Sequence, residues 1–127
     1  PIYLGSRVPI ATTSMGRALL AALPERERLH ILDFIAKREP ERWTQIRSGI
    51  DRALEDYKAR GFTLSIGEWK ADVNAVGVPL IPADGSPIVA FNCGAPSFQL
   101  SRERLETDIG PRLVNMVRSV EALLGHH

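Results

Sequence analysis

Apolar side chains recur at helical spacing in the first half of the chain, which predicts three amphipathic helices. A hydroxyl residue, Thr13 or Ser14, stands where the cap of the first helix is expected. Prolines and a glycine mark the ends of these segments, because proline interrupts a helix and glycine readily forms a left-handed cap. The helices are predicted over 14–23, between Pro24 and Pro40, and over roughly 46–60 with Gly61 as the cap.

After Gly61 the repeat of apolar positions changes to a period of two. Alternation over 62–66 predicts a half-buried strand, and a second strand is predicted over 73–81. The sequence Ala-Asp-Gly-Ser at 83–86 is a hairpin signal, because its Asp-Gly pair tolerates positive φ angles. A third strand is therefore expected to return from residue 88 to residue 93 or 94.

A last amphipathic helical region opens at Ser101. Gly110 and Pro111 are expected to kink this region or to restart the helix, since proline is tolerated in a first turn. The predicted order is three helices, three strands and a final helical region, without βαβ alternation. This order predicts an α+β fold whose sheet is antiparallel.

Composition narrows the class of protein. A chain of 127 residues suits one domain, and 44% hydrophobic residues exceed what disordered chains carry. The single cysteine, Cys93, excludes an internal disulfide and a multi-cysteine zinc site. No apolar run approaches the ~20 residues of a bilayer-spanning helix. We therefore expect a soluble cytoplasmic protein with no membrane partner and no cofactor.

The distribution of charge argues against direct nucleic-acid binding. The net charge is +1, and acidic and basic residues are interleaved along the chain. A surface that binds DNA needs a patch of basic residues to neutralise phosphates. The sequence has no such patch, so this segment is not expected to bind DNA by itself.

Both ends of the sequence look artificial. The chain begins at Pro1 without an initiator methionine, and it closes on Gly125-His126-His127. We interpret residues 125–127 as the remnant of a purification tag, so the histidine pair is not taken as a metal site. The domain is therefore expected to occupy residues 1–124.

The two strands of the predicted hairpin have unequal faces. One face carries bulky side chains that suit packing against helices: Val76, Val78, Leu80, Val89 and Phe91. The other face carries small or polar residues: Ala75, Gly77, Ala90, Asn92 and Gly94. A face of small residues leaves room either for a ligand or for the close approach of a helix backbone. The pattern alone favours neither interpretation.

The start of the first helix is a second candidate site. Its backbone N–H groups and the hydroxyls of Thr13 and Ser14 suit an anion, although ordinary helix capping explains the same residues. Trp69, in the loop between the first two strands, could stack on a ligand or simply be half-buried.

Catalytic signals are weak. Cys93 would need a base, and the internal histidine, His30, is predicted in a helix far from it. We therefore expect Cys93 to be inert and packed. Glycine-rich phosphate loops, paired carboxylates and metal-ligand spacing are missing from the sequence. No catalytic or metal-binding residue is predicted, and we expect the protein not to be an enzyme.

Several segments together resemble the C-terminal part of IclR-type transcriptional regulators. Each segment is weak alone, but they occur in the family's order over nearly the whole chain. They are Ser6-Arg7-Val8-Pro9 with the following 11–21, Arg60-Gly61-Phe62, Gly67-Glu68-Trp69, 74–79, 86–96, Leu100-Ser101 and the final helix up to Gly125.

This resemblance implies a GAF-like effector-binding domain, with an antiparallel sheet flanked by helices, whose N-terminal part precedes Pro1. It also implies that DNA is bound only by a winged helix-turn-helix domain outside this chain, and that the regulator is a homodimer or homotetramer. Effector binding would then modulate DNA binding. The alternative functions are a GAF-like enzyme and a catalytically silent interaction module.

The resemblance also places the ligand between the sheet and the loop that opens the first helix. Ala75, Asn92 and Gly94 stand where glyoxylate-binding relatives have a cysteine and two serines, and Ser65 stands where some relatives have an aspartate. A larger, less polar organic acid is therefore expected. The predicted effector-binding residues are Thr13, Ser14, Met15, Ser65, Trp69, Ala75, Asn92 and Gly94.

Overall fold

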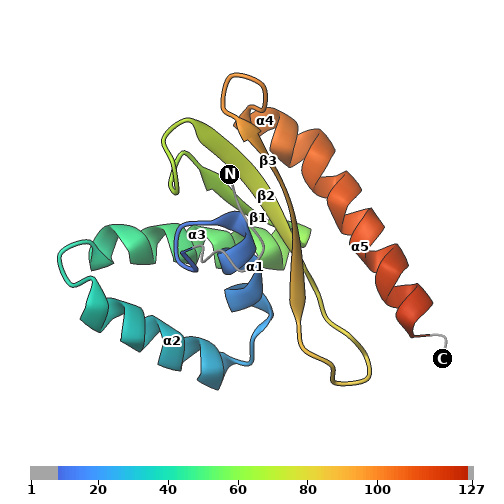
Figure 1. The fold of residues 1–127 in the computed structure, drawn as a ribbon, viewed down its shortest axis with the longest axis horizontal. Helices are drawn as coiled ribbons and strands as arrows, with labels where there is room; N and C mark the ends of the chain where they lie inside the picture. Colours follow the sequence, from blue (N-terminus) through green and yellow to red (C-terminus); the bar gives the residue numbers. More distant parts are fainter. Residues whose placement is uncertain (1–8, 126–127) are drawn as a thin grey trace.

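The computed structural model describes residues 9–125, and it confirms the α+β prediction. The predicted tag residues His126 and His127, and the first eight residues of the chain, lie outside the described part. A three-stranded antiparallel sheet stands between a group of helices on one side and one long helix on the other (Figure 1). The elements are α1 Ser14–Ala22, α2 Glu25–Arg38, α3 Trp43–Arg60, β1 Thr63–Ile66, β2 Val73–Leu80, β3 Val89–Pro96, α4 Arg102–Arg104, a π-helical segment Leu105–Ile109 and α5 Gly110–Leu124.

The helix ends follow from capping chemistry. Thr13 caps α1, because its side-chain oxygen accepts a 3.0 Å hydrogen bond from the Gly16 N–H. Gly61 ends α3 with a φ of 85°, the left-handed conformation predicted for it. The α3 helix begins at Trp43, earlier than the predicted residue 46, because the turn after Pro40 already leads into helix.

The strands pair in the order β1-β2-β3. Ala75 lies opposite Gly94 and Gly77 opposite Asn92, so these residues share one face of the hairpin, as predicted. The bulky face turns toward α5, and α1 and α3 lie on the opposite side of the sheet (Figure 1). β3 continues to Pro96, two or three residues beyond the predicted end at residue 93 or 94.

Two apolar clusters hold these layers together. The first lies between the bulky face of the sheet and the C-terminal helices, and it contains Phe62, Leu64, Val76, Val78, Leu80, Leu100, Leu105 and Val117. The second joins α1, α2 and α3 and contains Ala11, Leu20, Leu32, Ile35, Ile46 and Ile50. Val89 was expected to pack with the bulky face, but it stays 48% exposed on β3.

The C-terminal region changes its hydrogen-bond pattern where the restart was predicted. Pro111 lacks an N–H group, and the Gly110 N–H bonds back to the Leu105 carbonyl, five residues earlier. A Cβ at residue 110 would lie 2.8 Å from the Phe62 ring, so glycine lets this segment rest on the core. None of the helices described for residues 9–125 is both long and apolar enough to cross a membrane.

Candidate functional site

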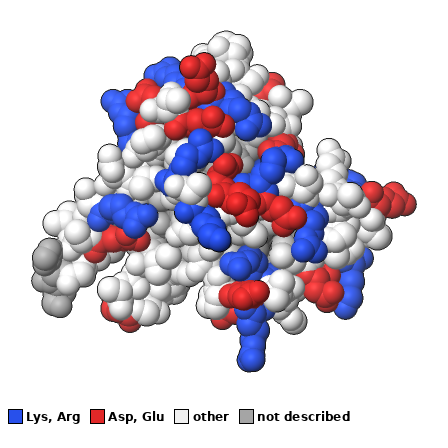
Figure 2. Space-filling model, turned by 180° about the vertical axis from the view of Figure 1, so that it is seen from behind, with Lys and Arg blue, Asp and Glu red and all other residues white. Residues whose placement is uncertain are grey.

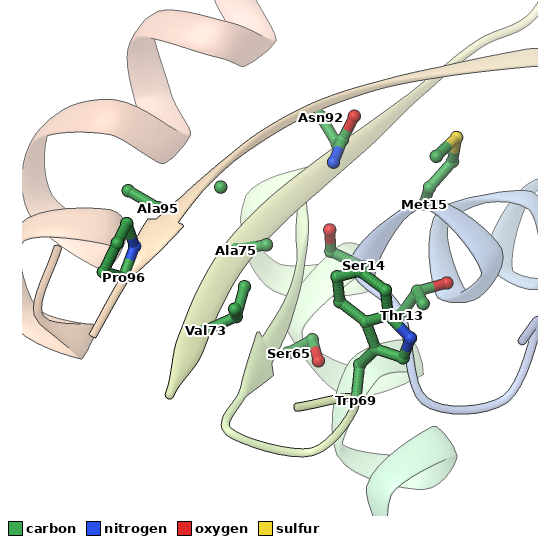
Figure 3. Close-up of a pocket in the computed structure, with 11 residues that line it drawn as sticks. Thr13, Ser14, Met15, Ser65, Trp69, Val73, Ala75, Asn92, Ala95 and Pro96 are labelled. Carbon is green, nitrogen blue, oxygen red and sulfur yellow. The ribbon is translucent and has the colours of Figure 1, made fainter. Parts of the chain in front are cut away.

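A cavity of about 270 Å³ opens between the start of α1, the loop after β1, the beginning of β2 and the end of β3 (Figure 3). All eight residues predicted for the site line this one cavity: Thr13, Ser14, Met15, Ser65, Trp69, Ala75, Asn92 and Gly94. They come from four segments of the chain, which the fold brings together. Val73, Ala95 and Pro96 complete the wall.

Two of the three additional wall residues, Val73 and Pro96, were missed for a local reason, whereas Ala95 pairs with Asn74 and belongs to the alternate face of the hairpin. Val73 continues the small face of β2 two positions before Ala75, and it pairs with Pro96. Extending the same period along β3 would have found Pro96, but that strand was predicted to end at residue 93 or 94. Ala90 was grouped with the small face, yet it does not line the cavity.

The small face has both of the features that the sequence left open, a close approach of a helix backbone and an open space. At Gly77 the backbone of α1 approaches the sheet so closely that a Cβ would lie 2.4 Å from the Ser14 carbonyl oxygen. Thr63 holds this contact by donating a 2.8 Å hydrogen bond to the same oxygen. Farther along the hairpin, at Ala75 and Gly94, the helix no longer covers the sheet and the cavity begins.

The start of α1 has unused hydrogen-bond donors beside the cavity. Thr13 is already satisfied, because its hydroxyl donates to the Pro9 carbonyl at 2.6 Å and accepts from Gly16. Among residues 9–125, the Ser14 hydroxyl and the backbone N–H groups of Ser14 and Met15 make no hydrogen bond. The Thr13 hydroxyl is thus engaged within the protein, and the role of Thr13 and Ser14 as donors to an anion stays a prediction.

The remaining polar groups of the cavity, Ser65 and Asn92, can also accept hydrogen bonds. Ser65 donates its hydroxyl hydrogen to the Thr12 carbonyl at 2.6 Å, so only its oxygen lone pairs are left for a ligand. Asn92 carries both donors and an acceptor, and it lies on the cavity side of β3 (Figure 3). None of the eleven lining residues carries a charge. The cavity can therefore hold an apolar body with a few polar substituents.

A buried ion pair lies next to the cavity and links α1 to the loop that carries Trp69. The Arg17 side chain is 3% exposed, and its guanidinium contacts both carboxylate oxygens of Glu68 at 2.8 and 2.9 Å. Burial raises the pKa of Glu68, but the contacts with Arg17, the Ile66 N–H and Arg52 outweigh it, so this pKa lies below its ordinary value. Sequence reasoning missed Arg17, because only the fold brings it to Glu68.

The structure does not assemble a catalytic centre from Cys93 and His30. Cys93 pairs with Val76 and lies on the sheet face opposite the cavity, and His30 is exposed on α2. Cys93 is also exposed, so the expectation that it would be packed is wrong: β3 has a strand on one side only within the described residues. Across residues 9–125, acidic, histidine and cysteine side chains form no group that could hold a metal ion.

Comparison with protein families gives a match over nearly the whole chain. Residues 2–122 match the family model for the bacterial transcriptional regulator IclR C-terminal region. The regulator TsaQ1/TsaQ2 of Comamonas testosteroni is 27% identical over 118 residues, which cover 93% of this chain and 42% of that protein. The chain thus spans less than half the length of such relatives, which are transcriptional regulators and not enzymes.

Solved structures agree with this match. An IclR family regulator from Brucella abortus superposes with a TM-score of 0.92 and 54% identity, over 97% of this chain and 47% of that one. The PobR inducer-binding domain from Acinetobacter, solved as a 3-hydroxybenzoic acid complex, gives a TM-score of 0.68 at 22% identity. It covers 94% of this chain and 69% of its own, and at this identity the likeness concerns the fold alone. On the family match and the Brucella structure together, this chain belongs to the IclR family of transcriptional regulators, within the family's C-terminal effector-binding domain.

Proposed function

We propose that the cavity at the start of α1 binds a small organic acid, and that this acid is the effector of the regulator. The observation that carries the proposal is the set of unused donors of Ser14 and Met15 at one end of an uncharged cavity. Helix-start N–H groups cannot be satisfied within their own helix, and the helix dipole favours an anion there. A carboxylate fits both conditions.

The rest of the acid is aromatic or branched. Beyond the helix start, the wall is formed by Val73, Ala75, Ala95 and Pro96, with Trp69 on one side. An indole ring offers a broad apolar surface to a flat or branched group. Asn92 and the Ser65 oxygen would contact a polar substituent such as a hydroxyl. The PobR complex with 3-hydroxybenzoic acid supports the proposal as far as it shows that this fold can hold such a molecule.

Effector binding would act on DNA through parts of the protein outside this chain. We place the DNA-binding winged helix-turn-helix outside residues 1–127, since the chain covers less than half of relatives such as TsaQ1/TsaQ2. The effector changes DNA binding only if it prefers one arrangement of the DNA-binding domains over another. We further propose that the regulator works in the cytoplasm as a homodimer or homotetramer. Analytical ultracentrifugation of the full chain, meaning residues 1–127 together with the rest of the regulator, would test the oligomeric state.

Calorimetric titration of the full chain tests the acid proposal. Benzoate, 4-hydroxybenzoate and isobutyrate are compared with their neutral amides, and the acids are expected to bind more tightly. Hydrogen bonds to charged groups contribute about 1.5–3 kcal/mol each, so Ser14→Asp, which places a like charge beside the carboxylate, is expected to weaken the bound acids at least about tenfold.

The matched control is Ser119→Asp, which introduces the same charge on the exposed side of α5. This variant is expected to keep the affinity of the wild type. Binding of the amides alone, or equal acid affinity in the Ser14→Asp variant with the fold intact, would contradict the proposal.

A further inference from the structure

Arg17 connects the walls of the cavity without lining it. Its Nε donates to the Ala11 carbonyl, and its Nη1 donates to the Leu64 carbonyl, each at 3.0 Å. The same guanidinium makes the paired contact with Glu68. Each partner stands close in sequence to a residue that lines the cavity. Ala11 precedes α1 and is near Thr13, Leu64 lies in β1 next to Ser65, and Glu68 follows β1 next to Trp69.

Glu68 fixes the loop that carries Trp69. One carboxylate oxygen accepts from the Ile66 N–H at 3.2 Å, and the other accepts from Arg52 of α3 at 3.2 Å. Gly49 of α3 leaves the space for this arrangement, because a Cβ there would lie 2.3 Å from an Arg17 nitrogen. The carboxylate next to Trp69 is therefore held from three directions.

Trp69 borders two hollows, and the Lys70 ammonium lies over its ring, 4.7 Å from the ring centroid. Trp69 lines the effector cavity, and it also lines a hollow of about 540 Å³ between residues 9–12, α2 and the start of α3. Close packing normally fixes a large aromatic ring. Here Trp69 adjoins a hollow, and the Lys70 that covers its ring belongs to the same loop, so we expect the position of the ring to depend on how firmly the neighbouring Glu68 is anchored.

We propose that Arg17 is a positioning residue of the effector site: acting through Glu68, it holds Trp69 as the wall of the cavity and so sets the affinity for aromatic acids. The inference rests on the proposed function, because the affinity it concerns is that of the effector cavity. When the anchor is lost, Trp69 gains access to the outer hollow, and an aromatic ligand loses the surface against which it stacks.

The test uses Glu68→Gln in the full chain, with Trp43→Phe in every variant so that Trp69 is the only tryptophan of the 127 residues. Glutamine keeps the shape of the side chain but removes the charge that Arg17 holds. Glu68→Gln is expected to raise the acrylamide quenching of Trp69 fluorescence about twofold and to weaken benzoate about tenfold. Glu55→Gln, which removes an exposed carboxylate from α3, is the control and is expected to change neither quantity.

A double-mutant cycle separates positioning from a general loss of structure. Trp69→Leu removes the wall, so adding Glu68→Gln is expected to cause less than about a twofold further loss of benzoate affinity. If the effects of the two substitutions multiply instead, or if Glu68→Gln leaves the quenching unchanged, Arg17 does not act through Trp69. If Glu68→Gln fails to fold, Arg17→Lys replaces it, because lysine keeps the charge but loses the paired contact.

The outcomes distinguish the two proposals. If the wild type binds no benzoate, the proposed aromatic effector is contradicted, and the quenching of Trp69 alone decides whether Arg17 positions the ring. If benzoate binds and the cycle shows independent effects, the effector proposal stands and the positioning role is lost.

Discussion

The cavity exists because individual residues next to it are small. Ala75 is 8% exposed and lies in the floor of the cavity between Ser65 and Gly94, its partners across the sheet. Beside it, Gly77 lets α1 touch the sheet. Ligand binding is therefore expected to depend on the size of residue 75, and folding on the size of residue 77, although both lie on β2.

Ala75→Leu is expected to fill the cavity. The larger side chain occupies the volume of the ligand, so benzoate affinity falls at least about tenfold. Because the new side chain enters open space, the thermal unfolding midpoint should stay within about 4 °C of the wild type. Calorimetry and thermal unfolding measure the two effects. Ala122→Leu, on an exposed part of α5, serves as the control, and equal benzoate affinity in both variants would contradict the role given to Ala75.

Gly77→Ala is expected to act on stability first. A Cβ there meets the Ser14 carbonyl oxygen at 2.4 Å, and backbone atoms cannot rotate away as a side chain can. Overpacking of this kind costs about 1–3 kcal/mol, which urea denaturation measures. Gly94→Ala is the comparison, because its Cβ meets a side-chain atom first, the Ala75 Cβ at 3.1 Å, and backbone atoms only from 3.5 Å outward. A Gly77→Ala variant as stable as Gly94→Ala would show that α1 is not held against the sheet there.

Among individual residues, the sequence predicted the site positions that alternate along a strand or stand at the start of a helix. Period-two patterning placed Ala75, Asn92 and Gly94 on one face, and the register confirms it. Arg17 could not be found in this way, because the carbonyl of Leu64 that it contacts lies 47 residues away. Such a partner depends on how elements pack, which local pattern does not contain.

Among the elements, the loop between β1 and β2 is held through the charged side chain of Glu68. The folded pKa of Glu68 lies below its ordinary value of 4.5, since its charged neighbours outweigh the effect of burial. A carboxyl group with a depressed folded pKa stabilises the fold fully above its unfolded pKa, and this stabilisation is lost as the pH falls through the folded pKa.

The free energy of unfolding is therefore expected to lose the Glu68 contribution only below about pH 4.5. Urea denaturation at a series of pH values compares the wild type with Glu68→Gln. The difference between the two should be constant at neutral pH and shrink below that value. A difference that does not change as the solution is acidified would mean that Glu68 is not held in its charged form by Arg17.

The elements themselves were largely predictable, and their ends less so. Proline and glycine marked the helix boundaries correctly, as at Gly61. The strand β3 runs on to Pro96 because pairing with β2 continues as far as Val73. Pairing partners, more than the residues of the strand itself, decide where an edge strand ends.

For the whole molecule, the surface charge is mixed. Figure 2 shows basic and acidic groups interspersed over the face it presents, and many ion pairs join residues four apart on one helix, as between Lys37 and Asp33. A DNA-binding surface would need basic groups without such neighbours. Residues 1–127 alone are therefore expected not to bind duplex DNA specifically at physiological salt. Fluorescence anisotropy with promoter DNA tests this, and specific binding that persists at that salt would contradict it.

We expect the effector acid to bind with its carboxylate at the start of α1. NMR titration of the ¹⁵N-labelled full chain with benzoate, and separately with benzamide, tests it most directly. The Ser14 and Met15 amide protons are expected to move downfield with benzoate and much less with benzamide, because only the carboxylate offers a charged acceptor to these unused donors. Equal shifts with both compounds, or benzoate shifts confined to residues outside the cavity, would contradict the claim.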